Sequence, residues 1–181
     1  MRKTAVGLLV LLMLTAGATA YGYQSLQEVY DNAGPGGEYE KYITLDPDVD
    51  YEGDLFIPYN VTVRIIGNGA RIFGSNGQTS IIVFNNSKLD ISGCVFIGGG
   101  YGICYRNFAG GEAYCNTITA MDTAGIYTQT KDNDNPREIY SNIITDCRYG
   151  IITIENNIPF YIGYNIIHDI YFYNYAQYCP G

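Results

Sequence analysis

Two short polar segments carry the side chains best suited to holding a metal ion. Lys131-Asp132-Asn133-Asp134-Asn135 and Glu155-Asn156-Asn157 each follow an apolar run and combine carboxylates with amides. Carboxylates that lie close together repel one another unless a cation sits between them, and Ca²⁺ accepts flexible sites rich in oxygen. We therefore expect Asp132, Asp134 and Glu155 to be candidate calcium ligands, with calcium as the one cofactor to consider.

Three residues that precede the first segment in the chain have side chains that can bind a sugar. Arg106 could pair with the carboxylate of a uronate, Tyr127 could stack on a sugar ring, and Gln129 could exchange hydrogen bonds with hydroxyl groups. If chemistry occurs, Arg106 and Lys131 are the candidate bases. Together with the calcium ligands, these residues predict an acidic-glycan site.

The same stretch also allows a purely structural interpretation. If Ile103, Ile126 and Ile151 point inward, alternation along a strand sends their neighbours outward. That alternation also sends Ile152 and Ile154 outward, where they interrupt the polar row. A solvated face without a ligand is therefore the alternative.

A repeated phrase sets the positions of all these residues. Asn116, Asn142 and Asn165 recur at intervals of 26 and 23 residues, and Cys94 occupies the corresponding place one copy earlier. A Gly-Ile phrase follows three of the four copies at Gly102-Ile103, Gly125-Ile126 and Gly150-Ile151, and Asn174-Tyr175 takes its place after the last. A period in the twenties is typical of stacked units that cannot bury their apolar faces alone.

Each unit holds three apolar runs of about three residues, rich in Ile, Val, Thr and Tyr. Such runs favour strands and are too short for helices. The sequence therefore predicts an all-β fold, a right-handed parallel β-helix (solenoid). Leucine-rich repeats would need a Leu-x-x-Leu-x-Leu framework that is missing here, and left-handed hexapeptide helices need a shorter period.

The stacking predicts a column of side chains at one corner of the solenoid. Cys94, Asn116, Asn142 and Asn165 would lie one above another, and the amides could bond along the column. We expect each Asn to take the left-handed backbone of a tight bend, and the Gly of each Gly-Ile phrase to do the same. Asp122, Asp146 and Asp169 recur in the turn after the third strand, which we attribute to turn formation.

A short amphipathic helix is predicted before the first coil. Ser25-Leu26-Gln27-Glu28 has the spacing of a capping box, and Gly34-Pro35-Gly36 ends the segment. A solenoid needs its first coil covered, because bare strand edges invite association. We therefore divide the chain into a signal peptide (1–20), an N-terminal cap of helix and first strands (21–56) and solenoid coils (57–181).

The first 20 residues have the three parts of a secretory signal. Arg2-Lys3 precedes the apolar run from Ala5 to Leu14, and Ala18-Thr19-Ala20 supplies the small residues of a cleavage site. An uncleaved membrane anchor is the alternative, although the run is short for a bilayer. We expect a secreted or cell-surface protein, periplasmic in an envelope with two membranes, and not membrane-bound after cleavage.

The charge of the chain narrows the classes of binding partner, and its cysteine count limits the disulfide bonds that can form. The chain has 10 Lys and Arg against 18 Asp and Glu, a net charge of −8, which disfavours nucleic acid and anionic membranes. Extracellular polysaccharide is the partner class that we consider. Five cysteines leave at least one without an intramolecular partner. Cys94 and Cys115 could bridge adjacent coils or remain buried thiols, and the sequence leaves both open.

The last coil carries no covering element in this sequence. From Ile57 onward, repeats of about 24 residues give about five coils, and Cys179-Pro180-Gly181 follows a strand that would start another. An uncovered coil exposes apolar side chains and strand edges. We therefore expect either a fragment truncated at its C-terminus or end-to-end self-association.

The order of the N-terminal elements resembles the opening of a known superfamily. A helix, Gly-Pro-Gly, a strand, the run from Tyr51 to Pro58, a further strand and Gly67-Asn68-Gly69 are similar to the start of pectate-lyase-like right-handed β-helix proteins. The Asn-x-Ile and Gly-Ile phrases resemble the parallel β-helix repeats of NosD-like proteins. The resemblance covers Ser25 to Tyr175, with departures at Glu38-Tyr39-Glu40-Lys41, a small insertion, and at the acidic stretch 46–50.

This resemblance implies the fold more strongly than an activity. The Asn-Thr-Asp, Asp-Asp, Gly-His-Gly and Arg-Ile-Lys motifs of polygalacturonase-like hydrolases are missing, as is the Asp-Pro-His motif of alginate-epimerase-like members. Calcium-dependent lyases are less tied to such motifs. Two functions follow: a non-catalytic exported module that serves as a surface, adhesive or carbohydrate-binding protein, or a lyase-like enzyme acting on an acidic extracellular glycan.

Overall fold

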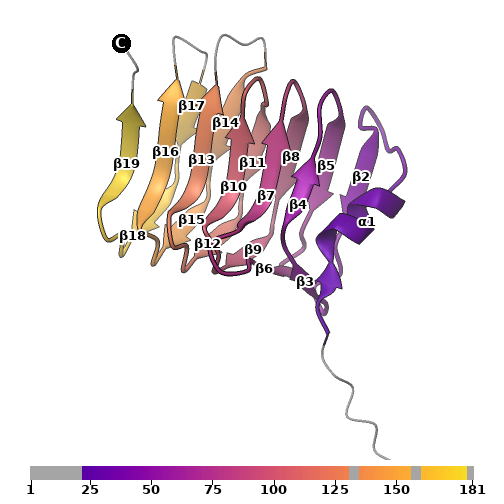
Figure 1. The fold of residues 1–181 in the computed structure, drawn as a ribbon, viewed down its shortest axis with the longest axis horizontal. Helices are drawn as coiled ribbons and strands as arrows, with labels where there is room; N and C mark the ends of the chain where they lie inside the picture. Colours follow the sequence, from indigo (N-terminus) through magenta and orange to yellow (C-terminus); the bar gives the residue numbers. More distant parts are fainter. Residues whose placement is uncertain (1–21, 131–134, 156–159, 179–181) are drawn as a thin grey trace, which may run out of the picture.

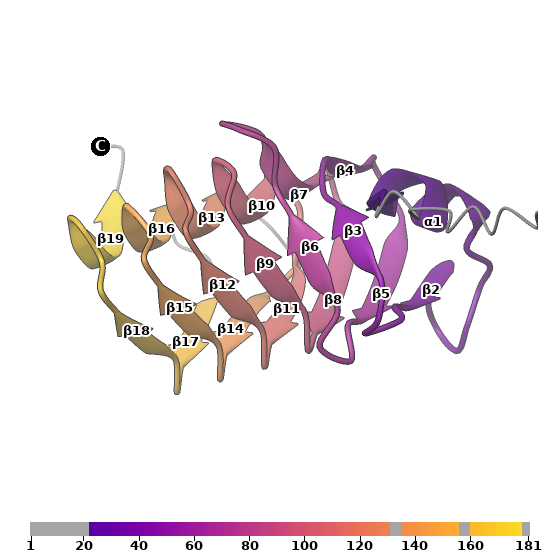
Figure 2. The ribbon, with the colours of Figure 1, turned by 90° about the horizontal axis from the view of Figure 1, so that it is seen from below.

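The computed structural model describes residues 22–130, 135–155 and 160–178, which form a parallel β-solenoid. Three sheets run along one axis (Figures 1 and 2). Sheet 1 contains β4 (Leu55–Ile57), β7 (Thr79–Phe84), β10 (Tyr101–Arg106), β13 (Ala124–Thr130), β16 (Tyr149–Glu155) and β19 (Tyr173–Tyr178). Sheet 2 contains β2 (Lys41–Thr44), β5 (Thr62–Ile66), β8 (Lys88–Ser92), β11 (Gly111–Tyr114), β14 (Arg137–Tyr140) and β17 (Phe160–Gly163). Sheet 3 contains β1 (Gln24–Ser25), β3 (Asp50–Glu52), β6 (Arg71–Phe73), β9 (Val95–Ile97), β12 (Thr117–Thr119), β15 (Ile143–Thr145) and β18 (Ile166–His168).

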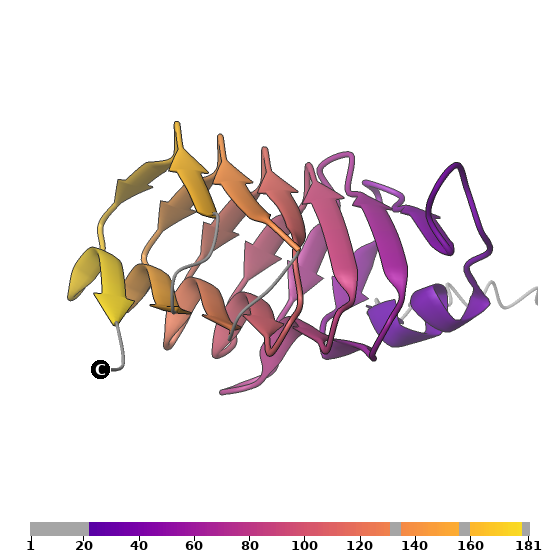
Figure 3. The same ribbon diagram turned by 90° about the horizontal axis from the view of Figure 1, so that it is seen from above.

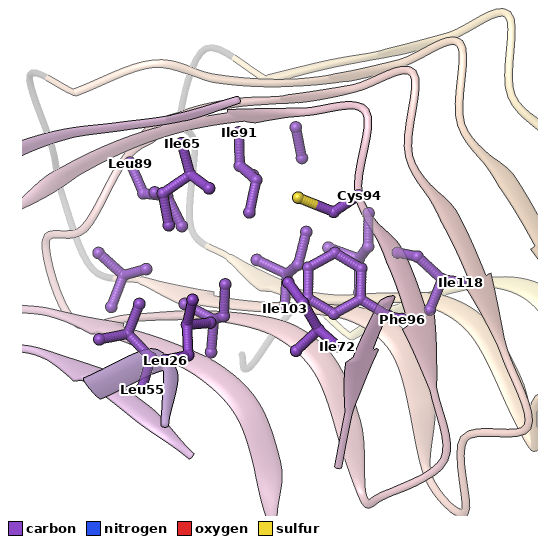
Figure 4. Close-up of a cluster of buried hydrophobic side chains, with 14 of the residues drawn as sticks. Leu26, Leu55, Ile65, Ile72, Leu89, Ile91, Cys94, Phe96, Ile103 and Ile118 are labelled. Carbon is purple, nitrogen blue, oxygen red and sulfur yellow. The ribbon is translucent and has the colours of Figure 1, made fainter. Parts of the chain in front are cut away.

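The strand register explains the repeat. Ile81, Ile103, Ile126 and Ile151 are paired in sequence along sheet 1, so one inward position is isoleucine in four successive coils. All four are fully buried. Figure 4 shows side chains of all three sheets meeting in this core, among them Leu55, Leu89 and Phe96. The predicted all-β parallel solenoid is therefore confirmed, whereas its membership of the pectate-lyase-like superfamily stays a prediction.

The predicted asparagine column is a hydrogen-bonded ladder between coils. Asn116 Oδ1 accepts the backbone N–H of Cys94 at 3.0 Å, and Asn142 Oδ1 accepts that of Asn116 at 3.0 Å. Asn165 Oδ1 accepts the N–H of Asn142 at 2.9 Å. The amide nitrogens of the three asparagines donate to carbonyls of the preceding coil, at Ile91, Ala113 and Ile139. The column therefore satisfies backbone groups at a buried corner.

The backbone reason that we gave for this column is wrong. The left-handed residue is the one before each column position, with φ of 69° at Gly93, 53° at Cys115, 56° at Ser141 and 56° at Tyr164. The bend precedes the asparagine and leaves the asparagine side chain directed along the stack. The asparagines are therefore needed for their amides and not for a left-handed backbone.

The glycines of the Gly-Ile phrase also serve a different purpose from the predicted one. Gly102, Gly125 and Gly150 are not left-handed. A Cβ on Gly125 would lie 2.6 Å from Cγ2 of Ile144 and 2.9 Å from the carbonyl oxygen of Gly150. The glycine is required because the next coil and an inward isoleucine approach too closely for any side chain.

The predicted N-terminal helix is present as α1 (Leu26–Asn32), which lies at one end of the stack (Figures 1 and 3). Ser25 is the N-cap, and its hydroxyl accepts the N–H of Glu28 at 3.3 Å. Leu26 and Tyr30 join the main core, and Gln27 Oε1 accepts the N–H of Phe56 on β4 at 2.9 Å. The helix thus covers apolar side chains and also satisfies a backbone donor of the first strand of sheet 1.

The cysteines do not bridge within the described part of the chain. Cys94, Cys104, Cys115 and Cys147 are free thiols there, so the Cys94–Cys115 bridge that we considered is not formed. Cys94 faces the core and shares the asparagine column, whereas Cys115 occupies the exposed bend before Asn116.

The signal segment 1–20 lies outside the described residues. Among the residues that are described, no helix is long and apolar enough to cross a membrane.

Candidate functional site

Three residues predicted to bind substrate come together on the outer face of sheet 1. Cζ of Arg106 on β10 lies 5.6 Å from the centre of the Tyr127 ring on β13. The hydroxyl of Tyr127 donates to Oε1 of Gln129 at 3.1 Å. Pairing of Arg106 with Gln129 across the two strands places all three on the same face. The structure thus assembles Arg106, Tyr127 and Gln129 from two adjacent coils.

The guanidinium of Arg106 is only partly satisfied by the protein. Its Nε is buried and has no hydrogen-bond partner among the described residues. Burial raises the pKa of the neighbouring Cys104 thiol to about 11, although Arg106 acts in the opposite direction. Burial also raises the pKa of Tyr127, again opposed by Arg106. Both neighbours therefore stay protonated at neutral pH, so neither of them supplies a negative charge to Arg106.

An apolar cluster surrounds these residues on the outside of the solenoid. Cys104, Ala124, Tyr127 and Ile152 are buried there, separately from the main core. Ile154 packs against the cluster, as the outward direction predicted for it and for Ile152 requires. The outer face of sheet 1 therefore carries a buried apolar layer that includes the Tyr127 ring, with partly exposed Arg106 and exposed Gln129 at its margin, and not a continuous polar row.

Most of the predicted calcium site cannot be placed. Lys131, Asp132 and Asp134 lie outside the described residues. For Glu155 the backbone alone is described, and it pairs with Thr130 at the end of β13. Calcium binding by Asp132, Asp134 and Glu155, and the role of Lys131 as a base, therefore stay predictions.

A hollow of about 830 Å³ lies beside the apolar cluster, between the edges of sheets 3 and 1. Three successive turns line it, and its polar and aromatic residues are Asp122, Asp146, Arg148, Tyr171 and Phe172. Asp146 is left-handed with φ of 53°, which confirms its predicted role in the turn. The hollow was not predicted, because the repeat period alone does not show that two of the turn carboxylates share a cavity with an arginine.

A second polar network lies on the outer face of sheet 2 and was not predicted. The Tyr39 hydroxyl donates to Oδ2 of Asp90 at 2.6 Å, and Lys88 Nζ lies 3.0 Å from the same oxygen. Oδ1 of Asp90 accepts the N–H of Glu112 at 2.9 Å. Asp90 is 2 % exposed, so these partners take the place of water around its carboxylate. The one sequence signal was the insertion that contains Tyr39, 51 residues from Asp90.

The other polar side chains of this closed network also bond to one another. Arg64 donates to the hydroxyl of Tyr114 and lies 5.2 Å from the centre of the same ring. Tyr114 and Tyr140 stack at 5.1 Å, and the Tyr140 hydroxyl donates to Glu112 at 3.2 Å. Burial, together with Glu112, raises the pKa of Tyr140 to about 12. The network binds its own charges and offers few free donors or acceptors to a ligand.

Comparison with protein-family models, with curated proteins and with solved structures finds no match to this chain. The function must therefore be argued from the geometry of the two faces and of the hollow.

Proposed function

We propose that this protein is an exported, non-catalytic β-solenoid that binds extracellular carbohydrate through the outer face of sheet 1. The observation that supports this most directly is Arg106, a guanidinium set beside an aromatic ring with a buried Nε that has no partner among the described residues. Arg106 as a whole is partly exposed, so the rest of its guanidinium can donate to a ligand oxygen. Gln129 adds exposed amide groups on the same face.

The setting of these residues suits a sugar better than the other large partner classes. Aromatic surface with a few fixed polar groups is typical of sites for small polar ligands. The net charge of −8 disfavours nucleic acid and anionic membranes. Placement on stacked strands holds the side chains more rigidly than a loop would. Export rests on the signal pattern in residues 1–20, and we propose a secreted or cell-surface location on that basis.

The lyase-like alternative depends on residues that cannot be placed. Two of its three calcium ligands, Asp132 and Asp134, and one of its two candidate bases, Lys131, lie in the segment 131–134, and of Glu155 only the backbone is described. Among the described residues, no group of three or more His, Cys, Asp and Glu side chains is arranged to hold a metal. A calcium-dependent lyase acting on an acidic glycan therefore stays a prediction, and the carbohydrate-binding function is the one that the described geometry supports.

Calorimetric titration of the chain with a panel of neutral, uronate and amino-sugar oligomers, with and without Ca²⁺, tests the proposal. We expect at least one oligomer to bind and Arg106→Gln to weaken its binding by about tenfold, since each lost charged hydrogen bond is worth about 1.5–3 kcal/mol. Arg71→Gln is the matched control, because Arg71 lies on sheet 3 and is paired with Asp50 at 2.7 Å.

Three outcomes would decide between the alternatives. If no oligomer binds, or if Arg71→Gln weakens binding as much as Arg106→Gln, the proposal is wrong. If unsaturated products appear in the presence of Ca²⁺, the protein is an enzyme and the lyase-like alternative replaces it.

A further inference from the structure

The hollow beside sheet 1 brings together charged and aromatic side chains from three successive turns. The N–H of Arg148 donates to the carbonyl of Met121 at 3.0 Å, and the N–H of Phe172 donates to the carbonyl of Arg148 at 3.0 Å. These bonds fix the turns side by side, so Asp122, Arg148 and Phe172 face the same hollow. Its volume of about 830 Å³ is within the range of small-molecule sites.

Among the described residues, the charged side chains of the hollow form no ion pair with one another. Arg148 lies over the Phe172 ring, with its Cζ 4.9 Å from the ring centre, and forms no ion pair with Asp122 or Asp146 among the described residues. Asp146 accepts a hydrogen bond from Thr145 at 3.4 Å, and the Asp122 carboxylate has no partner in the described part of the chain. Two carboxylates against one guanidinium leave the hollow negative.

The aromatic wall of the hollow continues onto the outer face of sheet 1. Phe172 stacks on Tyr149 with ring centres 5.4 Å apart and an interplanar angle of 19°. Tyr149 in turn packs against the apolar cluster that contains Tyr127. A ligand in the hollow would therefore meet both carboxylates and exposed aromatic side chains, because Phe172 and Tyr171, which line it, are 55 % and 76 % exposed.

We propose that this hollow binds a sugar residue that carries a protonated amine, which makes amino-sugar polymers the ligand class of the carbohydrate-binding function on which this inference rests. The ammonium group would pair with Asp122 and Asp146, the apolar face of the sugar ring would lie on the exposed ring of Tyr171, and Arg148 would donate to hydroxyl oxygens. Phe172, which already contacts Arg148 and Tyr149, would hold Arg148 in place. A uronate is disfavoured by the net negative charge of the hollow. The flat, exposed ring of Tyr171 also fits a sugar ring better than it fits the narrow chain of a lysine.

Titration calorimetry with three oligomers tests this at low salt. The probes are a glucosamine tetramer, its N-acetylated counterpart and a galacturonate tetramer. We expect the glucosamine tetramer to bind at least about tenfold more tightly than either of the others, and Asp122→Asn/Asp146→Asn to remove that advantage. Asn tolerates the left-handed backbone of Asp146, so the turn is retained. Asp169→Asn is the matched control, since Asp169 has the same left-handed backbone one coil further on and does not line the hollow.

The outcomes separate this inference from the function on which it rests. If other oligomers bind in a manner sensitive to Arg106→Gln but the glucosamine tetramer has no advantage, the hollow proposal is wrong and carbohydrate binding stands. If no oligomer binds, both fail. If pentalysine displaces the glucosamine tetramer at equal concentration, the hollow is a general cation site and the sugar assignment is overturned. Thermal unfolding of each variant checks that loss of binding is not loss of the fold.

Discussion

Two arginines on opposite faces of the solenoid each lie over a tyrosine ring, yet their surroundings differ. Arg64 on sheet 2 is 5.2 Å from the centre of the Tyr114 ring and donates to the hydroxyl of the same tyrosine. Arg106 on sheet 1 is 5.6 Å from the centre of the Tyr127 ring, and its buried Nε has no partner among the described residues. Similar residue types therefore serve a closed network on one face and an open one on the other.

We attribute the network on sheet 2 to the stability of the fold, and we propose that the incomplete one on sheet 1 binds a ligand. On sheet 2, Asp90 is surrounded by the Tyr39 hydroxyl, Lys88 and the N–H of Glu112, so its role is to hold adjacent coils together. On sheet 1, the tyrosine hydroxyl turns to Gln129 instead of to the arginine. The comparison suggests that polar groups left incomplete by the protein mark the ligand-binding face.

The largest effect on stability should come from removing the centre of the closed network. Asp90→Ala deprives Tyr39, Lys88 and the Glu112 N–H of their acceptor, which we expect to lower the free energy of unfolding by about 2–4 kcal/mol. Urea denaturation measures it. Glu138→Ala is the control two coils along in the same outward column, and we expect a change of less than about 0.5 kcal/mol. Equal effects would show that the network does not stabilise the fold.

A smaller effect is expected from the insertion that supplies Tyr39. Tyr39→Phe removes a 2.6 Å hydrogen bond to a buried carboxylate and should cost about 1 kcal/mol in the same assay. Tyr42→Phe removes the hydroxyl of a neighbouring, more exposed tyrosine and is the matched control. If the two variants unfold at the same urea concentration, the insertion does not anchor sheet 2.

Alkaline pH should weaken the network on sheet 2 through the Tyr140 hydroxyl. Burial and Glu112 raise the pKa of Tyr140 to about 12, above its ordinary value of about 10. The folded state then binds this proton more tightly than the unfolded chain, so the contribution is complete below about pH 10 and is lost as pH rises towards about 12. We expect Tyr140→Phe to reduce the fall of the urea midpoint between about pH 10 and about pH 12. Tyr59→Phe, at an exposed position, should leave that fall unchanged.

Features that follow from the repeat period could be predicted from the sequence. Features that depend on contacts between particular side chains mostly could not. The column of Asn116, Asn142 and Asn165 could be found because the same corner recurs in each coil, and each amide bonds the next coil. The reason for Gly125 could not be found in this way. Its need for a small residue comes from Ile144 and Gly150 in the next coil, and a left-handed glycine would have the same repeat pattern.

The candidate site shows the same limit. Arg106, Tyr127 and Gln129 were placed on one face by alternation along paired strands, which is a local rule. The Tyr39–Asp90 contact joins residues 51 positions apart through coils that precede the clear repeat, so no local rule indicates it. The hollow at Asp122 and Asp146 was missed because the repeat period does not show which turn residues line a common cavity.

The most direct test of the account compares glycan binding by Arg106→Gln and Arg64→Gln. Both substitutions remove a guanidinium from over a tyrosine ring and keep an amide in its place. Calorimetry with the oligomer that binds the wild-type chain should show about a tenfold loss of affinity for Arg106→Gln and an unchanged affinity for Arg64→Gln. An equal loss in both variants, or a loss confined to Arg64→Gln, would contradict the assignment of the binding face to sheet 1.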